Sequence, residues 1–404
     1  MRIPYRSLTF WIFAGLFGGI LAGIAIGESV VPLAQLMSDV FLKLLRMAIM
    51  PLVITSLISA VINVGEKKDL EILGAKTFAY YITTTVVAIL TGQILVNIFK
   101  PGVDAGIEFQ QVVTQIPAVH QGWKDLFLSM IPENPFQAMA EGQVLPIIFF
   151  SILFGYFVTR LGEPHRSKLG ELFHASFHAM MKLTHAIIWL APVGVFGINA
   201  VIVATTGFES FRSLGFYSVL VLVGLFIHGC ITLPLIVYLV THKSPLRHYR
   251  GMPPALVTAF STGSSLVTLP LTMEAVTQNS KVSEKIASFV LPIGATVNMD
   301  GTALYQGIAV IFIAQIYGVA MSLDQQLVIV VTAVLASIGA ASVPMSGLVM
   351  MSIILGAVGL PLEGVALVLA VDRILDMFRT MVNVLGDSCG AVVVAKWEGE
   401  EVLT

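Results

Sequence analysis

The sequence predicts an all-α integral membrane protein with eight transmembrane helices and two re-entrant helical hairpins. Of the 404 residues, 56% are hydrophobic and only 11% are charged, and the mean hydropathy is +0.90. Soluble domains carry about a quarter charged residues, so a long chain with half that density places most of its surface against lipid. A net charge of −2 and a pI near 6.4 argue against nucleic acid as a partner.

Eight apolar runs are long enough to cross a bilayer, which takes about 20 residues. They lie at 8–27, 31–63, 76–99, 143–160, 183–206, 214–241, 286–319 and 364–395. The first run is too long for the core of a cleaved signal peptide, so we expect it to be retained as a span. Cys230 and Cys389 lie in apolar runs and are too few and too far apart to indicate a disulfide framework or a metal site.

Two further apolar stretches, about 252–276 and 326–360, are interrupted by small and hydroxyl-bearing residues bounded by proline. If both re-enter the side they left, fourteen of the 22 basic residues lie on the inner side and three on the outer side. This asymmetry places both termini in the cytoplasm and the multi-pass chain in the plasma (inner) membrane. Paired interruptions in corresponding places indicate inverted repeats around a transporter binding site. Two ordinary spans containing Ser and Pro remain the alternative.

The last apolar run carries a polar stripe. Its members recur mostly every three or four residues, which puts them on one helix face: Asp372, Asp376, Arg379, Thr380, Asn383 and Asp387. An ionisable group at bilayer depth normally faces the protein interior and has a partner. An interhelical ion-pair network without a transport role is the alternative to a binding site.

A second polar interruption, Asn298 and Asp300 followed by Gly301, indicates an unwound turn in the seventh run. With this aspartate the two segments bring four carboxylates against the one guanidinium of Arg379, and the orientation of Arg373 stays open. Such an excess of buried negative charge requires protonation or bound cations. Hard cations such as Na⁺ take carboxylate, amide and carbonyl oxygens, and a guanidinium suits a carboxylate.

At these motifs, Asn298-Met299-Asp300-Gly301-Thr302 and Asp376-x-x-Arg379-Thr380-x-x-Asn383-x-x-x-Asp387, the sequence resembles the dicarboxylate/amino acid:cation symporter family. That family includes the excitatory amino acid transporters and archaeal sodium/aspartate transporters. The resemblance implies that the protein is a transporter rather than an enzyme. It also implies a lipid-embedded homotrimer that works by an elevator mechanism. It also implies a scaffold of residues 1–64 and 123–206 and a transport domain of residues 76–99 and 213–396.

The resemblance also implies an acidic amino acid, L-aspartate or L-glutamate, as substrate. Asp376 is expected to bind its amino group and Arg379 its side-chain carboxylate, while Asn383 and the tip at Ser264 and Ser265 hold the α-carboxylate. Thr302 and Thr380 lie nearby, and the second hairpin tip, Val343 to Gly347, is expected to act as the gate.

Three Na⁺ sites follow from the same resemblance. One is expected to use Asp387, Asn383, Gly294 and Asn298. A second is expected to use Thr296, Ser337, Ile338 and Ala340. The residues of a third are Tyr81, Thr84, Thr85, Asn298 and Asp300.

The sequence departs from the family at several positions. Relatives often carry an arginine where Gly263 or Met377 stands here, which leaves the electrostatics around Asp376 open. A glutamate linked to proton co-transport is Gln306, and Leu266 and Ser342 also differ. Proton coupling, a C4-dicarboxylate or a neutral amino acid as substrate are the alternatives within this fold.

Overall fold

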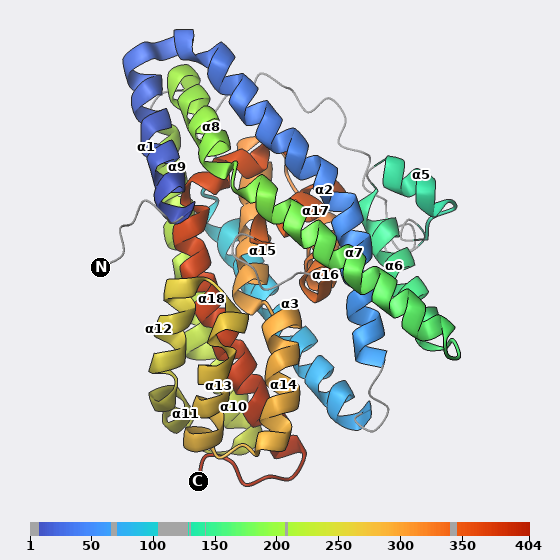
Figure 1. Cartoon of the computed structure of the whole chain (residues 1–404). Coiled ribbons are helices and arrows are strands. Elements are labelled where there is room, and N and C mark those ends of the chain that lie inside the picture. The colour runs from blue at the N-terminus through green and yellow to red at the C-terminus, as the bar shows by residue number, and fades with distance from the viewer. Residues whose placement is uncertain are drawn as a thin grey trace.

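The computed structural model describes residues 8–65, 71–103, 128, 131–141, 143–206, 209–339 and 346–404. Within these ranges every regular element is a helix, so the all-α prediction is confirmed (Figure 1). Five of the described helices are long and apolar enough to cross a membrane: Ala14–Phe41, Ile72–Phe99, Ser213–Thr241, Glu284–Ile316 and Val371–Trp397. The count of eight spans stays a prediction.

One group of helices packs around α2. It consists of α1 (Leu8–Ile26), η2 (Gly27–Val30), α2 (Val31–Gly65), α5 (Pro135–Ala140), α6 (Val144–Thr159), α7 (His165–Ile188) and α8 (Ala191–Thr206). On α1, Gly15, Gly19 and Gly23 face α8 so closely that a Cβ on Gly19 would touch the carbonyl oxygen of Phe196. Glycine at this four-residue spacing lets two helix backbones meet inside a membrane, where lipid gives no hydrophobic drive for association.

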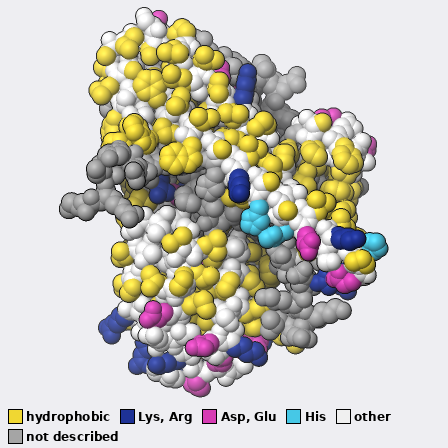
Figure 2. Space-filling view, viewed as in Figure 1, with side chains coloured by type: hydrophobic (Ala, Val, Ile, Leu, Met, Phe, Trp, Pro, Cys, Tyr) yellow, Lys and Arg dark blue, Asp and Glu magenta, His cyan; other side chains and the backbone are white. Residues whose placement is uncertain are grey.

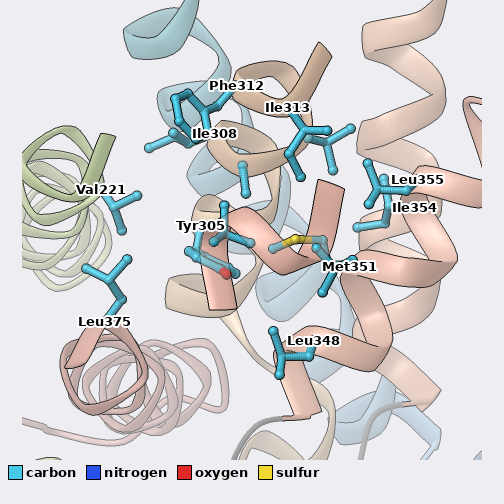
Figure 3. Packing of buried hydrophobic residues seen from close by; sticks show 14 of the residues in the cluster. Val221, Tyr305, Ile308, Phe312, Ile313, Leu348, Met351, Ile354, Leu355 and Leu375 are labelled. Atoms are coloured by element: carbon cyan, nitrogen blue, oxygen red, sulfur yellow. The ribbon is translucent and has the colours of Figure 1, made fainter. Parts of the chain in front are cut away.

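A second group of helices surrounds α15 and α18. It contains α3 (Glu71–Phe99), α9 (Glu209–Ile227), η4 (His228–Thr232), α10 (Leu233–Thr241), α11 (Leu246–Gly251), α14 (Glu284–Val297), α15 (Asp300–Ile316) and α18 (Gly364–Trp397). Side chains of α15, including Ile308 and Phe312, pack in the main hydrophobic core with Leu348 and Met351 (Figure 3). α15 is buried over nearly its whole length. It is therefore the central helix of this group, against which the polar residues are positioned.

Two helix pairs complete this second group. The first is α12 (Pro253–Thr262) with α13 (Ser265–Ser280), joined at Gly263 and Ser264, and the second is α16 (Leu323–Gly339) with α17 (Ser346–Ala357). Gly263 has φ +63°, a left-handed conformation that suits glycine, and the hydroxyl of Ser264 caps α13 by accepting a hydrogen bond from the backbone N–H of Val267. The pairs match the two interrupted stretches, and their re-entry into the membrane stays a prediction.

Charged side chains gather at the end of the molecule that carries α11 and the C-terminal segment, while apolar side chains cover much of the rest of the visible face (Figures 1 and 2). There Lys243 Nζ donates to the carbonyl of Val402 at 2.9 Å, and the backbone N–H of Leu403 donates to the carbonyl of Ser280 at 2.9 Å. Glu400 accepts hydrogen bonds from both the N–H and the hydroxyl of Ser283. The segment after α18 therefore fastens α10 to the end of α13.

Candidate functional site: two buried polar clusters

The polar stripe of α18 is buried, as the sequence predicts. Asp372 and Arg379 have no exposed surface, and Asp376, Asn383 and Asp387 are 7%, 5% and 3% exposed. The stripe contributes to two groups of side chains. We call them the arginine cluster (Asp372, Arg373, Asp376, Arg379 and Tyr305) and the carboxylate cluster (Tyr81, Thr84, Thr85, His228, Asn298, Asp300 and Asp387).

In the arginine cluster, one guanidinium lies between two carboxylates. Arg379 Nη2 donates to Asp376 Oδ1 at 2.9 Å and lies 3.0 Å from Asp372 Oδ1. The guanidinium carbon of Arg379 stands 3.9 Å from the centre of the Tyr305 ring, a cation–π contact. Within the described residues, Nε and Nη1 of Arg379 have no hydrogen-bond partner. Two N–H directions of a buried cation thus remain available to an acceptor.

The turn of the first helix pair and the start of α17 in the second pair both approach the arginine cluster. A Cβ built on Gly263, between α12 and α13, would lie 2.9 Å from Arg373 Nη1 and 3.4 Å from Asp376 Oδ2. One built on Gly347, at the start of α17, would lie 3.1 Å from Arg379 Nη1. The structure therefore brings Gly347 and the turn before Ser264 and Ser265 to the charged residues. Val343 lies outside the described residues.

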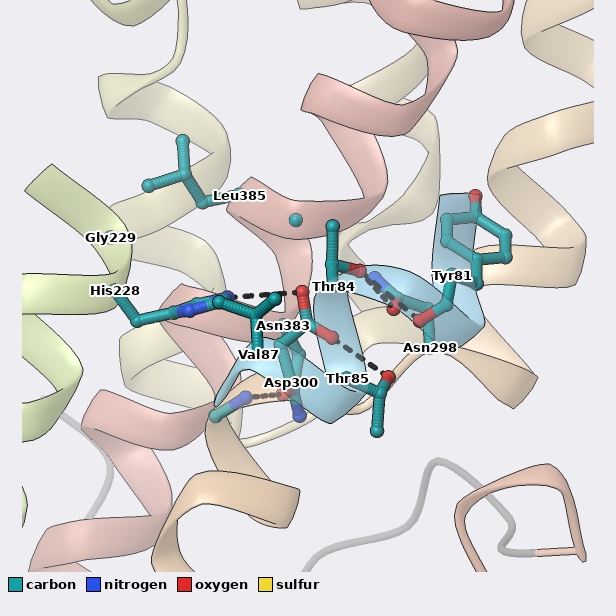
Figure 4. A network of polar contacts seen from close by, with 12 residues as sticks. Tyr81, Thr84, Thr85, Val87, His228, Gly229, Asn298, Asp300, Asn383 and Leu385 are labelled. Carbon is teal, nitrogen blue, oxygen red and sulfur yellow. Dashed lines mark hydrogen bonds and ion pairs between the residues drawn. The ribbon is translucent and has the colours of Figure 1, made fainter. Parts of the chain in front are cut away.

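In the carboxylate cluster, Asp300 at the start of α15 has a partner on each oxygen. The hydroxyl of Thr85 donates to Oδ1 at 2.9 Å, and Nε2 of His228 lies 3.2 Å from Oδ2 (Figure 4). Both Asp300 and His228 are fully buried. α3 and η4 thus meet at the first residue of α15, where a helix N-terminus also favours a carboxylate.

Asn298, in the break between α14 and α15, joins Asp387 to α3. Its amide donates to Asp387 Oδ1 at 3.0 Å, and its carbonyl oxygen lies 3.5 Å from the hydroxyl of Thr84. The predicted unwound turn is confirmed, since α14 ends at Val297 and α15 begins at Asp300. Oxygen atoms of an amide, a carboxylate and hydroxyls converge here, which is the donor set that hard cations take.

Two glycines leave room for this convergence. A Cβ on Gly294 would touch the Tyr81 hydroxyl and lie 2.7 Å from Asp387 Oδ1. A Cβ on Gly386 would lie 2.8 Å from Asp300 Oδ2 and 3.0 Å from Asn298 Nδ2. Any larger residue at either position would occupy space beside the carboxylates. The residues present therefore fit a small cation.

Asn383 connects the two clusters through the backbone of α15. Its side-chain oxygen accepts from the N–H of Gly301 at 2.8 Å and of Thr302 at 3.3 Å, and its amide donates to the Thr302 hydroxyl at 3.2 Å. Thr380 instead donates its hydroxyl to the carbonyl of Asp376. Asn383 and Thr302 thus meet, and one amide N–H of Asn383 helps to hold the first turn of α15.

The expected second cation site is not assembled by the described contacts. The hydroxyl of Thr296 donates to carbonyls of its own helix, and so does that of Ser337. The side chain of Ile338 and all of Ala340 lie outside what the structure describes. This set stays a prediction.

Comparison of the sequence with known proteins identifies the family of this chain. The profile of the sodium:dicarboxylate symporter family matches residues 8–397. The chain belongs to this family. The proton/glutamate-aspartate symporter of Escherichia coli is 39% identical over 91% of this chain and 86% of its own length. Excitatory amino acid transporter 3 of Mus musculus is 36% identical, over 97% and 86% of the two chains. The proton/sodium-glutamate symport protein of Geobacillus stearothermophilus is 36% identical, over 98% and 95%. The predicted resemblance is confirmed, and these relatives are transporters rather than enzymes.

Three residues of this symporter-family site escaped the sequence analysis. In the sequence, Tyr305 looks like an ordinary aromatic residue on an apolar helix. The sequence also does not show which way the side chain of Arg373 points. His228 carried a usable signal, because an ionisable residue inside an apolar span is a functional candidate by default. It lies in η4, a π-helical turn between α9 and α10, which has no sequence signature of its own.

The two clusters differ in charge balance. In the arginine cluster, the guanidinium groups of Arg373 and Arg379 offset the carboxylates of Asp372 and Asp376. The polar residues are thus neutralised by one another there more fully than the sequence suggested. In the carboxylate cluster there are two carboxylates, Asp300 and Asp387, and among the described contacts the basic side chain is His228, which lies against Asp300. The excess of negative charge that bound cations would neutralise therefore lies at Asp300 and Asp387.

Proposed function

We propose that this chain is a secondary active symporter that couples inward Na⁺ movement to uptake of an acidic amino acid. One observation supports it. The same helix, α18, contributes to the arginine cluster, whose charges balance, and to the carboxylate cluster, which has an excess of negative charge. The first cluster can exchange internal ion pairs for those of a zwitterion, and the second can take cations. The Escherichia coli relative is named for glutamate and aspartate, and the Geobacillus relative for glutamate.

In this proposal Arg379 binds the side-chain carboxylate through N–H groups of its guanidinium that have no described partner, those of Nε or Nη1. A hydrogen bond between a guanidinium and a carboxylate is charge-assisted and therefore strong. Asp376 takes the amino group, and Asn383 with Ser264 and Ser265 holds the α-carboxylate near Thr302 and Thr380. Gly347 and the adjoining tip at Val343 close over the substrate.

Sodium ions are carried at the oxygen-rich positions. Asp387 with Asn298, Asn383 and Gly294 forms one site, and Asp300 with Tyr81, Thr84 and Thr85 forms a second. A third uses Thr296 with the backbone at Ser337, Ile338 and Ala340. No group of three His, Cys, Asp or Glu side chains suited to a transition metal occurs within the described residues.

At the level of the assembly, we propose a homotrimer in the plasma membrane with both termini cytoplasmic. The helix group around α2 serves as the scaffold, and the group around α15 and α18 moves as the transport domain. The grouping of helix contacts supports this division, since α3 packs on α15 and α18 although it follows α2 in sequence. Carriage by this second group is an elevator motion.

Proton coupling is the second candidate. The Escherichia coli relative is named as a proton symporter, and the Geobacillus relative as a proton/sodium symport protein. The excess negative charge of buried carboxylates can be neutralised by protons as well as by metal ions. The oxygen donors around Asn298 favour Na⁺, because a proton needs no multi-ligand cage.

The test is uptake of radiolabelled aspartate into proteoliposomes under an imposed sodium gradient or a proton gradient alone. We expect the sodium gradient to drive accumulation. Arg379→Ala should abolish uptake while the melting temperature of the purified protein shows that it still folds. Arg250→Ala, on the exposed face of α11, serves as the matched control and should transport normally. Unchanged aspartate uptake by Arg379→Ala would end the assignment.

A further inference from the structure

Asp376 has a guanidinium on each of its carboxylate oxygens. Arg379 Nη2 donates to Oδ1 at 2.9 Å, and Arg373 Nη1 donates to Oδ2 at 3.3 Å. A substrate ammonium at Asp376 would meet the positive charge of both guanidinium groups, so it binds most strongly when one of them has moved away. One of the two guanidinium groups has to yield.

The surroundings decide which one yields. Arg379 is completely buried, lies 3.0 Å from Asp372 Oδ1 and rests on the ring of Tyr305. Arg373 keeps 13% of its side chain exposed, and its distance to Asp376 is the longer of the two. Moving a partly exposed guanidinium towards solvent costs less than breaking the contacts of a completely buried one, which would leave an uncompensated buried charge. Arg373 is therefore the cation that leaves.

The turn of the first helix pair, at Gly263, packs against the guanidinium of Arg373. Arg373 Nη1 lies 2.9 Å from where a Cβ on Gly263 would be, so the guanidinium fills space beside this turn that a side chain would otherwise take. Gly263 also has φ +63°. A displaced Arg373 thus alters the packing of the tip that carries Ser264 and Ser265.

We propose that Arg373 is a resident competitor for the amino-group site on Asp376 and sets how strongly the protein prefers amino dicarboxylates to plain dicarboxylates. The inference rests on the proposed role of Asp376 in substrate binding. Removing the competitor frees Asp376 for an ammonium, and for a ligand without an ammonium it leaves an uncompensated carboxylate in the site. The two ligand classes therefore respond in opposite directions.

The experiment measures the Kd of L-aspartate, and the inhibition constant of succinate against it, for purified wild type, Arg373→Gln and Arg373→Lys in saturating sodium. We expect Arg373→Gln to bind aspartate about fivefold more tightly and succinate about fivefold more weakly. Arg373→Lys keeps the positive charge and should keep the wild-type ratio of the two constants. A general folding defect would weaken both ligands together, which separates it from the expected result.

The outcomes are distinct. If Arg373→Gln weakens both ligands, or changes neither, Arg373 does not compete for Asp376 and the inference is wrong. If succinate fails to inhibit any variant, tighter aspartate binding by Arg373→Gln alone supports the inference, and unchanged or weaker binding overturns it. A wild type that does not bind aspartate would refute the proposed function itself.

Discussion

Single atoms decide the chemistry of the two clusters. Three oxygens of the carboxylate cluster, from Tyr81, Asp387 and Asp300, lie where a side chain on Gly294 or Gly386 would otherwise stand or reach. The family resemblance implied Gly294 as part of a sodium site, and the structure adds that its missing side chain matters as well. A pattern of residue types shows which donors are present, but it cannot show which neighbours must be absent.

At this scale we expect Gly294→Ala to impair cation binding specifically. Its new methyl group would touch the Tyr81 hydroxyl and lie 2.7 Å from Asp387 Oδ1, which forces both ligands outward. The sodium concentration for half-maximal aspartate binding should rise about tenfold or more, the usual effect of disturbing groups around a metal site. Sodium titrations of aspartate binding by the purified variant measure this.

Gly215→Ala is the matched control, because a Cβ at Gly215 meets open space. It should leave the titration unchanged. A normal sodium titration for Gly294→Ala would show that the space beside Asp387 is not used by a cation.

Whole elements were predictable where their ends carry strong signals. Gly263 and the hydroxyls around it predicted the turn between α12 and α13, and Asn298 and Asp300 predicted the break between α14 and α15. The apolar run at 214–241 gave no sign of the π-helical turn that points His228 at Asp300. Apolar periodicity reports length and burial, whereas a one-residue insertion into a helix depends on the neighbours it packs against.

The short helix α11 ties two other helices together through one imidazole. His248 is buried, with Nδ1 2.7 Å from the Ser280 hydroxyl of α13 and Nε2 3.0 Å from the Ser388 hydroxyl of α18. Burial lowers the pKa of His248 to about 4, from an ordinary value of about 6.5. The folded protein thus holds this imidazole neutral over a range in which the unfolded chain binds a proton.

We therefore expect a pH-dependent contribution of His248 to stability. It is fully present above about pH 6.5 and is lost as the pH falls towards 4, where its loss reaches about 3 kcal/mol. Melting temperatures of detergent-solubilised wild type and His248→Gln, measured from pH 7 to pH 4, should converge at the acidic end. His165→Gln, at an exposed position, controls for removing a histidine. A difference between wild type and His248→Gln that stays constant with pH would contradict this account.

For the whole molecule, the sequence predicted the class and the helix ranges well, because hydropathy over twenty residues is a strong signal. Predicted runs at 8–27, 76–99 and 364–395 end within a few residues of α1, α3 and α18, apart from the five-residue extension of α3 at its start. How the charges pair was not predictable. Helix spacing allows an ion pair between Arg373 and Asp376, three residues later, but it does not show whether the Arg373 guanidinium takes up that position beside Gly263.

The proposed assembly makes a prediction at this scale. If the helix group around α2 is a trimerisation scaffold, the protein extracted in mild detergent contains three copies of the 43.4 kDa chain. Sedimentation velocity corrected for bound detergent, or native mass spectrometry, gives the copy number directly. A monomeric particle that still transports aspartate after reconstitution would refute the trimeric scaffold while leaving the binding site intact.

The π-helical turn η4 also supplies a natural reporter. It carries His228, which faces Asp300, and Cys230, which is exposed, whereas Cys389 is buried. These are the two cysteines of the chain. A membrane-permeant maleimide dye should therefore label the unmodified protein at a single thiol, two residues from the carboxylate cluster. Its fluorescence can follow cation occupancy in real time, without any engineered cysteine.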